Sequence, residues 1–196
     1  MLPPLHRYLL LVAALTHDVG HPGHNNQWEV NTGSHLARRY DNKSVIENYS
    51  LDLTFELLSQ PGQNIVLDHR GRALPEAGEI LTDLILATDF AMHRAFLDEF
   101  TARLKKGPLD FNDADCLSLV TRAIIKAADI SNTSKAFTHA RFWGHRVMKE
   151  FWLQGQLEKK SNLPVGPLND QETVSVNAAQ AGFIKFAALE LFDLLS

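Results

Sequence analysis

Cysteine is almost absent from this chain: Cys116 is the only one among its 196 residues. A single cysteine cannot build a disulfide framework, so we expect a protein of a reducing compartment, with the cytoplasm as the default location. No apolar run approaches the roughly 20 residues that a membrane-spanning helix needs. The longest clear run, Leu9–Leu15, is not followed by the small-residue cleavage site of a signal peptide. We therefore expect no membrane segment in this chain.

An excess of positive charge is missing as well. The chain has 19 Lys and Arg against 23 Asp and Glu, for a net charge of −4. Binding to nucleic acid normally leaves a basic footprint, so we expect no nucleic-acid partner. The apolar content of 45% and the charged content of 21% are typical of a globular protein, and the length suits a single domain over residues 1–196.

Strand-type alternation and internal repeats are also absent, whereas helical periodicity runs through most of the chain. Apolar residues recur every three or four positions, between breaks such as Pro61-Gly62 and Gly107-Pro108. The stretch Ser44 to Glu47 has the pattern of a capping box at a helix start. These patterns predict an all-α fold with about eight helices. The predicted helices are 9–21, 27–40, 44–60, 77–88, 91–106, 113–129, 134–158 and a last one that Asp170 caps and that runs nearly to the C-terminus.

The stretch Thr16-His17-Asp18-Val19-Gly20-His21-Pro22-Gly23 carries the strongest chemical signal. If the preceding apolar helix continues through it, His17 and His21 lie one turn apart on one face, with Asp18 beside them. Pro22-Gly23 then ends the helix. Imidazole nitrogen and carboxylate oxygen are ligands that suit Zn²⁺ and other divalent ions. The alternative is an ordinary polar helix end, because short motifs have many false matches.

Other acidic residues stand at the ends of predicted apolar helices. Asp129 is the clearest case, since a carboxylate at a helix C-terminus meets the negative end of the macrodipole and a cation would remove the conflict. The alternative is an exposed Asp that starts a turn with Ser131 and Asn132. Asp89 follows another apolar helix in the same way. Glu47 already has a sufficient structural reason in the capping box.

In this order, these motifs resemble the catalytic domain of the class I 3′,5′-cyclic-nucleotide phosphodiesterases. The resemblance covers nearly the whole chain and implies a compact, multi-helix domain of the HD type. The matching motifs are His17-Asp18-Val19-Gly20-His21-Pro22-Gly23 with Asn26, Asn31-Thr32, Ser44-Val45-Ile46-Glu47-Asn48, Leu86-Ala87-Thr88-Asp89, Ala128-Asp129-Ile130-Ser131-Asn132, Arg146-Val147-Met148-Lys149-Glu150-Phe151 and Gln180-Ala181-Gly182-Phe183-Ile184.

The resemblance implies hydrolysis of cAMP, cGMP or both to the 5′-monophosphate by a hydroxide held between two divalent metal ions. It implies that His17, Asp18 and Asp129 are ligands of a tightly bound ion, usually Zn²⁺. Asp18 would also bridge to a second ion, Mg²⁺ or Mn²⁺. The implied catalytic residues are Asp18, His21 and Glu47. The residues implied to hold the ligands and their waters in place are His21, Asn26, Glu47, Thr88 and Asp89.

The resemblance also implies a site for the base of the nucleotide. The Gln180 amide both donates and accepts hydrogen bonds and can therefore bind a purine edge. Phe183 would stack on the ring from one side and Val147 from the other. The implied substrate-binding residues are Asn132, Val147, Phe151, Leu168, Gln180 and Phe183. The alternative is that the aromatic and aliphatic residues at helical spacing are plain core positions.

The chain departs from the family in what precedes His17. Family members carry an upstream helix with two histidines, one a metal ligand and the other the general acid that protonates the leaving 3′ oxygen. His6 is the only earlier histidine here, and its spacing to His17 does not match. We therefore expect an N-terminally truncated catalytic domain with little activity alone, because a positioned general acid contributes about 10²–10⁴-fold in rate. Regulatory domains, where present, would lie outside it.

Smaller departures and two alternatives remain. Lys126 stands where the family commonly has a histidine, and Ala140 where an aromatic is common near the pocket. One alternative function is a catalytically silent remnant that binds nucleotide or a partner chain. The other is a more distant HD-type nucleotide phosphohydrolase, which explains the metal ligands but not Gln180 with Phe183. Asn132 slightly favours cAMP, but the sequence does not decide between the two nucleotides.

Overall fold

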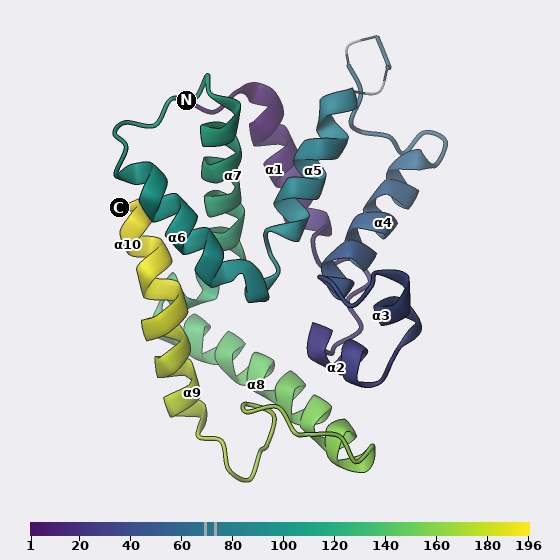
Figure 1. Cartoon of the computed structure of the whole chain (residues 1–196), viewed down its shortest axis with the longest axis vertical. Helices are drawn as coiled ribbons and strands as arrows, with labels where there is room; N and C mark the ends of the chain where they lie inside the picture. Colours follow the sequence, from purple (N-terminus) through teal and green to yellow (C-terminus); the bar gives the residue numbers. More distant parts are fainter. Residues whose placement is uncertain (69, 73) are drawn as a thin grey trace. The chain divides into compact units, whose positions relative to one another are not determined.

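The computed structural model describes residues 1–68, 70–72 and 74–196, and these form an all-α fold (Figure 1). The fold-class prediction is confirmed, and the described residues include no β-strand. Within them, no helix has the length and apolarity needed to cross a membrane. The elements are α1 (Pro4–Thr16), α2 (Asn26–Asn31), α3 (His35–Arg39), α4 (Val45–Ser59), α5 (Pro75–Leu86), η1 (Phe90–Met92), α6 (His93–Leu104), α7 (Ala114–Asp129), η2 (Ser131–Ser134), α8 (Phe137–Lys160), α9 (Val176–Phe183), η3 (Ile184–Ala188) and α10 (Leu189–Leu195).

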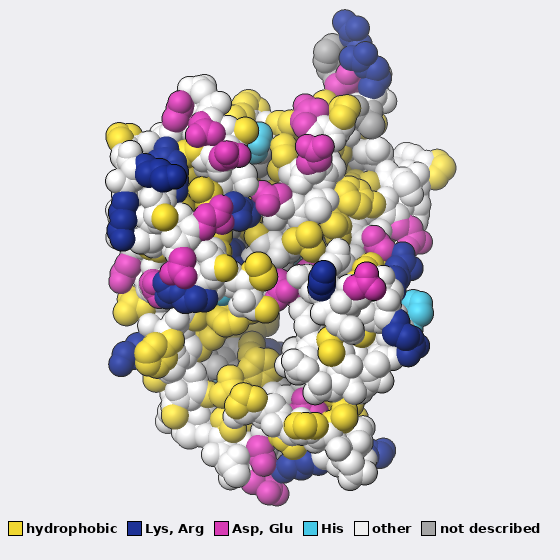
Figure 2. Space-filling view, in the orientation of Figure 1, with side chains coloured by type: hydrophobic (Ala, Val, Ile, Leu, Met, Phe, Trp, Pro, Cys, Tyr) yellow, Lys and Arg dark blue, Asp and Glu magenta, His cyan; other side chains and the backbone are white. Residues whose placement is uncertain are grey.

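The polypeptide forms two compact units. The first unit comprises Met1–His21 and Ile46–Asp129, and the second comprises Pro22–Val45 and Ile130–Ser196. Basic and acidic side chains are interspersed on the face shown in Figure 2.

In the first unit, α1, α5 and α7 pack against one another (Figure 1). Their inward-facing positions recur every three or four residues, which is the spacing that places apolar side chains on one helix face. Burial of each large aliphatic side chain stabilises the unit by about 1.5–3 kcal/mol. The packing of α1 on α7 also brings together residues far apart in the sequence. The buried cluster consists of Leu9, Val12, Ala13, Leu51, Val66, Ala77, Leu81, Leu84, Ile85 and Ile125.

In the second unit, the long helix α8 contacts α9, and α9, η3 and α10 form one continuous helix (Figure 1). The segment η3 within this helix has π-helical hydrogen bonding. The loop after α8 lies close against it, since a Cβ at Gly155 would lie 1.9 Å from the carbonyl oxygen of Asn169. Only glycine at position 155 therefore permits this approach.

A network of hydrogen bonds centred on the buried Glu158 connects the loop after α8 to that helix. The Glu158 carboxylate is 3% exposed and accepts hydrogen bonds from Gln154 Nε2 (2.7 Å), the backbone N–H of Gly166 (2.8 Å) and Asn169 Nδ2 (3.0 Å). Gln154 Oε1 in turn accepts from the backbone N–H of Asn25 at 2.9 Å. The loop and the chain before α2 are therefore both hydrogen-bonded to one helix.

Several helix boundaries differ from those predicted. The first helix ends at Thr16, and the chain then turns, with Val19 N–H donating to Thr16 O and Gly20 at a φ of +76°. The prediction that His17 and His21 share a helical face is therefore wrong.

Two other predicted helices differ for similar local reasons. The predicted helix 27–40 is divided into α2 and α3 by Gly33, whose φ is +57°, and Ser34 then caps α3. The last helix is capped by Ser175 rather than Asp170. The Asp170 carboxylate instead accepts from the backbone N–H of Glu172 and pairs with Lys159.

Candidate active site

Three predicted metal ligands meet in the first unit. His17 is the C-cap residue of α1, Asp18 follows it, and Asp129 is the last residue of α7, 112 positions from His17. His17 Nε2 lies 3.3 Å from Asp129 Oδ1 and 3.4 Å from Asp18 Oδ2. One ligand atom from each residue can be chosen so that all three lie within 4.8 Å of one another. The helix packing described above thus produces the predicted triad.

The imidazole of His17 is oriented by its second nitrogen. Nδ1 lies 3.1 Å from the carbonyl oxygen of Ala14, so a proton on Nδ1 is donated to the backbone. This leaves Nε2 directed at the two carboxylates. A histidine that binds a metal usually donates its other ring N–H in this way. One imidazole nitrogen and two carboxylate oxygens suit a divalent ion such as Zn²⁺ or Mg²⁺.

The charges around His17 favour a cation at this place. The hydrogen bond with Asp129 raises the pKa of His17 to about 9, partial burial opposes this, and the charges of Asp18 and Asp129 add to the increase. A metal-free imidazole therefore keeps a proton on Nε2 at neutral pH. A divalent ion bound between the same groups would take the place of that proton.

The raised pKa gives a test of this geometry in metal-free protein. The ordinary pKa of histidine is 6.5, so the stabilisation from protonated His17 is fully present below pH 6.5 and is lost as the pH rises through about 9. We expect the free energy of unfolding to fall over this range and the His17→Gln variant to lack this fall. NMR titration of the His17 ring protons should show a midpoint near 9. A midpoint at 6.5 would contradict the arrangement.

Lys126 is a buried neighbour of the triad on α7. It is 4% exposed, and its Nζ donates to the carbonyl oxygen of Ala87, beyond the end of α5, at 2.7 Å. Burial lowers the pKa of Lys126, while the charges of Asp129 and Asp89 act in the opposite direction. Lys126 therefore hydrogen-bonds the end of α5 to the last turn of α7. It lies one helical turn before Asp129.

The other residues predicted around the metals lie at helix ends in both units. Thr88 Oγ1 donates to the carbonyl oxygen of Ile85, and the buried Asp89 accepts from the backbone N–H of Ala91, so both shape the turn after α5. Glu47 is half-buried in the first turn of α4, and the exposed His21 follows the turn after α1. These four belong to the first unit. Asn26, at the start of α2, belongs to the second unit.

Two of the predicted base-binding residues line one cavity in the second unit. The cavity has a volume of about 420 Å³ and includes Asn132 and Gln180 in its lining. Arg141, His145 and Asn177 add polar groups that the sequence reading did not select. Arg141 and His145 could have been found from their helical spacing, since they are four residues apart on α8 and therefore share one face.

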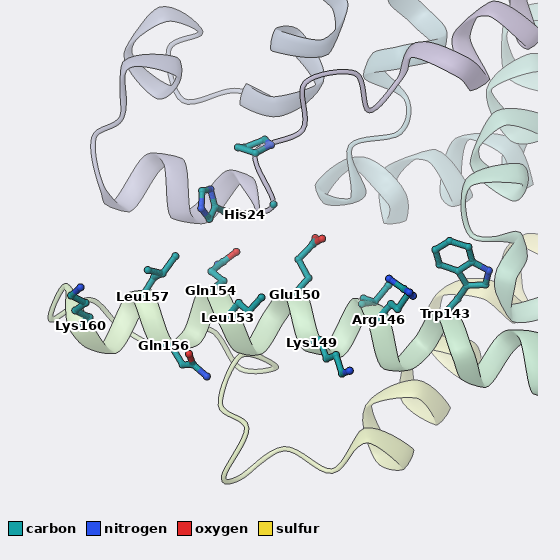
Figure 3. A pocket seen from close by; sticks show the side chains of 13 residues that line it. His24, Trp143, Arg146, Lys149, Glu150, Leu153, Gln154, Gln156, Leu157 and Lys160 are labelled. Atoms are coloured by element: carbon teal, nitrogen blue, oxygen red, sulfur yellow. The ribbon is translucent and has the colours of Figure 1, made fainter.

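The remaining base-binding candidates are not gathered in that cavity. Val147 lines a different groove of about 860 Å³ along α8, where Gln154 and Leu157 project toward the segment that carries His24 (Figure 3). Phe151 and Phe183 are half-buried on α8 and α9, and Leu168 is 40% exposed on the loop after α8.

The whole chain matches a protein family. Residues 1–196 match the family model described as 3′5′-cyclic nucleotide phosphodiesterase. The chain is 33% identical over 188 residues to the mouse protein named high affinity cGMP-specific 3′,5′-cyclic phosphodiesterase 9A, covering 96% of the chain and 35% of the relative. It is 33% identical over 192 residues to the Plasmodium falciparum protein named dual 3′,5′-cyclic-AMP and -GMP phosphodiesterase beta, covering 97% of the chain and 17% of the relative.

A solved structure has the same fold. The structure of LmjPDEB1 in complex with IBMX superposes with a TM-score of 0.92 at 34% identity, over 99% of this chain and 59% of the solved one. The chain thus spans about a third or less of the length of the two curated relatives, and somewhat more than half of the solved chain.

Proposed function

Because the chain belongs to the 3′,5′-cyclic nucleotide phosphodiesterase family, we propose that it forms part of an enzyme that hydrolyses cAMP, cGMP or both to the 5′-monophosphate. The observation that carries this proposal is the convergence of His17, Asp18 and Asp129 within 4.8 Å of one another. One relative is named as specific for cGMP and another as acting on both cAMP and cGMP. These names support a purine cyclic nucleotide as the substrate. We further propose that residues 1–196 belong to one catalytic domain of a cytoplasmic protein, and regulatory domains, where present, lie outside it.

The family is metal-dependent, and the triad suits a divalent ion. In this proposal His17, Asp18 and Asp129 hold a tight ion, Zn²⁺, and Asp18 also reaches a second ion, Mg²⁺ or Mn²⁺. When bound, such ions neutralise charge on the phosphoryl oxygens and activate the attacking water. The residues assigned to hold this arrangement in place are His21, Asn26, Glu47, Thr88 and Asp89, with Asp18, His21 and Glu47 in the catalytic role.

The base is assigned to the second unit. Gln180 and Asn132 present amide groups to the same cavity, and an amide can match the donor and acceptor pattern of a purine edge. Phe183 and Val147 are proposed to stack on the ring, with Phe151 and Leu168 close by. That LmjPDEB1 has been solved in complex with IBMX supports a small-molecule site on this fold.

We propose that these 196 residues alone hydrolyse slowly. They hold only His6 before His17, and therefore no pair of upstream histidines that could supply a general acid and a further ligand. A positioned general acid contributes about 10²–10⁴-fold in rate, so a longer chain that adds such a pair should be faster by a comparable factor.

The test measures turnover and binding together. The 196-residue chain and an N-terminally extended form are incubated with Zn²⁺, Mg²⁺ and cAMP or cGMP, and the monophosphate formed is identified by its position of phosphorylation. We expect the 5′-monophosphate, formed faster by the extended form. Nucleotide binding without hydrolysis by either form would favour the silent remnant. Hydrolysis of non-cyclic nucleotides with no cyclic activity would favour the more distant phosphohydrolase.

A further inference from the structure

Gly144 on α8 and Gln180 on α9 lie in direct contact within the second unit. A Cβ built on Gly144 would lie 2.7 Å from Gln180 Oε1, 2.9 Å from Cδ and 3.4 Å from Cγ. Real Cβ atoms essentially never approach another heavy atom within 3.0 Å. The Gln180 amide therefore occupies the space that the side chain of any other residue at position 144 would fill.

Helix propensity does not explain this glycine. Gly144 is buried in the interior of the 24-residue helix α8, where glycine is the least favoured residue after proline. Its backbone has an ordinary helical conformation, since it is not among the glycines with positive φ. The close approach of Gln180 is thus the structural reason for a residue without a side chain.

The side-chain amide of Gln180, which fits against Gly144, is available to bind a ligand. Gln180 is half-buried and lines the 420 Å³ cavity together with Asn132. Across the described part of the chain, no residue hydrogen-bonds the Gln180 amide. Its position is therefore set by packing, and the absence of a side chain at Gly144 leaves the space that the amide occupies.

We propose that Gly144 is a positioning residue that determines how Gln180 recognises the base; this inference rests on the proposed function. With no side chain at position 144, the Gln180 amide lies against α8 and leaves the cavity beside it open for the purine. A larger residue would displace the amide away from α8 and into that cavity. The backbone need not move, because only the far end of a flexible side chain meets the added Cβ.

The test compares glycine-to-alanine variants. Gly144→Ala should increase the thermal stability of the chain, since alanine is the better helix former. It should nevertheless weaken the binding of 5′-AMP and 5′-GMP by about 10-fold, the loss of one or two hydrogen bonds. The binding of ribose 5-phosphate, which has no base, should not change. Stability and base binding thus move in opposite directions, which a purely structural role of Gly144 does not produce.

Two variants serve as controls. The control substitutions are Gly182→Ala, on the same helix as Gln180, and Gly78→Ala, on α5. A Cβ at either position would have no heavy atom within 4 Å. Both should gain stability and keep the wild-type affinity for both nucleotides. In a Gln180→Ala background, Gly144→Ala should no longer change the affinity, because the displaced group is gone.

An NMR measurement keeps the proposal separate from the proposed function. In the wild-type chain, nuclear Overhauser effects should connect the Gly144 Hα protons with the Gln180 side-chain amide, and Gly144→Ala should abolish them. Absence of these effects in the wild type, or equal nucleotide affinities of wild type and Gly144→Ala, would overturn the inference. Failure of the wild type to bind either nucleotide while the effects are present would instead overturn the proposed function, and with it the role in base recognition.

Discussion

Replacement of Asp129 by asparagine should lower the affinity of the chain for Zn²⁺ by more than about 100-fold. Loss of a group that only supports a metal ligand typically costs 10–100-fold, so loss of a ligand charge should cost more. The amide has nearly the same shape as the carboxylate, which leaves the packing of α7 on α1 intact. It removes one of the two negative charges that face His17 Nε2, 3.3 Å away. Turnover of cAMP and cGMP should fall in parallel with metal content.

The measurement is a Zn²⁺ competition titration with a chromophoric chelator. Asp115→Asn is the matched control, because it makes the same substitution in an exposed residue of the first turn of the same helix. This control should bind Zn²⁺ like the wild type. Equal Zn²⁺ affinities of Asp129→Asn and the wild type would show that the triad is not the metal site.

Replacement of Glu158 by alanine should lower the free energy of unfolding by about 3 kcal/mol. The substitution removes the acceptor of three donors, two on buried side chains and one on the half-buried backbone of Gly166, and each lost hydrogen bond should cost about 1 kcal/mol. Burial acts to raise the pKa of Glu158, but the hydrogen bonds from Gln154, Asn169 and Gly166 outweigh it and lower that pKa below its ordinary value of 4.5. The ionised carboxylate therefore stabilises the fold above pH 4.5.

Urea unfolding at several pH values tests this prediction. The difference between wild type and Glu158→Ala should be full above pH 4.5 and shrink as the pH falls through the lowered pKa, because protonation removes the contribution in the wild type. Glu150→Ala, an exposed position two turns earlier on α8, should change the free energy by less than about 0.5 kcal/mol. Similar effects of the two variants would show that the loop after α8 does not depend on Glu158.

Helical periodicity, a strong local pattern, predicted the fold class, and the resemblance to the family led us to expect His17, Asp18 and Asp129 to lie close together, as they do. Helical periodicity placed α5 and α7 closely, and the motif around His17 and the carboxylate at the end of α7 were the signals for the three candidate ligands. The turn at Gly20 was missed, since the histidine spacing fits a helix equally well until the positive φ is known. The partition of 27–40 at Gly33 was missed for the same reason.

The supporting contacts could not be predicted, because their partners are distant in the sequence. Lys126 reads as one polar residue on an amphipathic helix, whereas its partner is a backbone carbonyl 39 residues away. A backbone acceptor leaves no sequence signal at all. The contact of Gly144 with Gln180 is similarly invisible, because it depends on how closely α8 and α9 approach each other.

The π-helical segment η3 between α9 and α10 has a consequence for how this chain tolerates insertions and deletions. A π-helical turn accommodates one more residue than an α-helical turn, and each residue of an α-helix advances the direction of side chains by about 100°. The residue count of Ile184–Ala188 therefore fixes the rotational phase between Gln180 and the buried Leu191. Loss of a single residue there would rotate Gln180 and Phe183 by about 100° around the helix axis relative to Leu191.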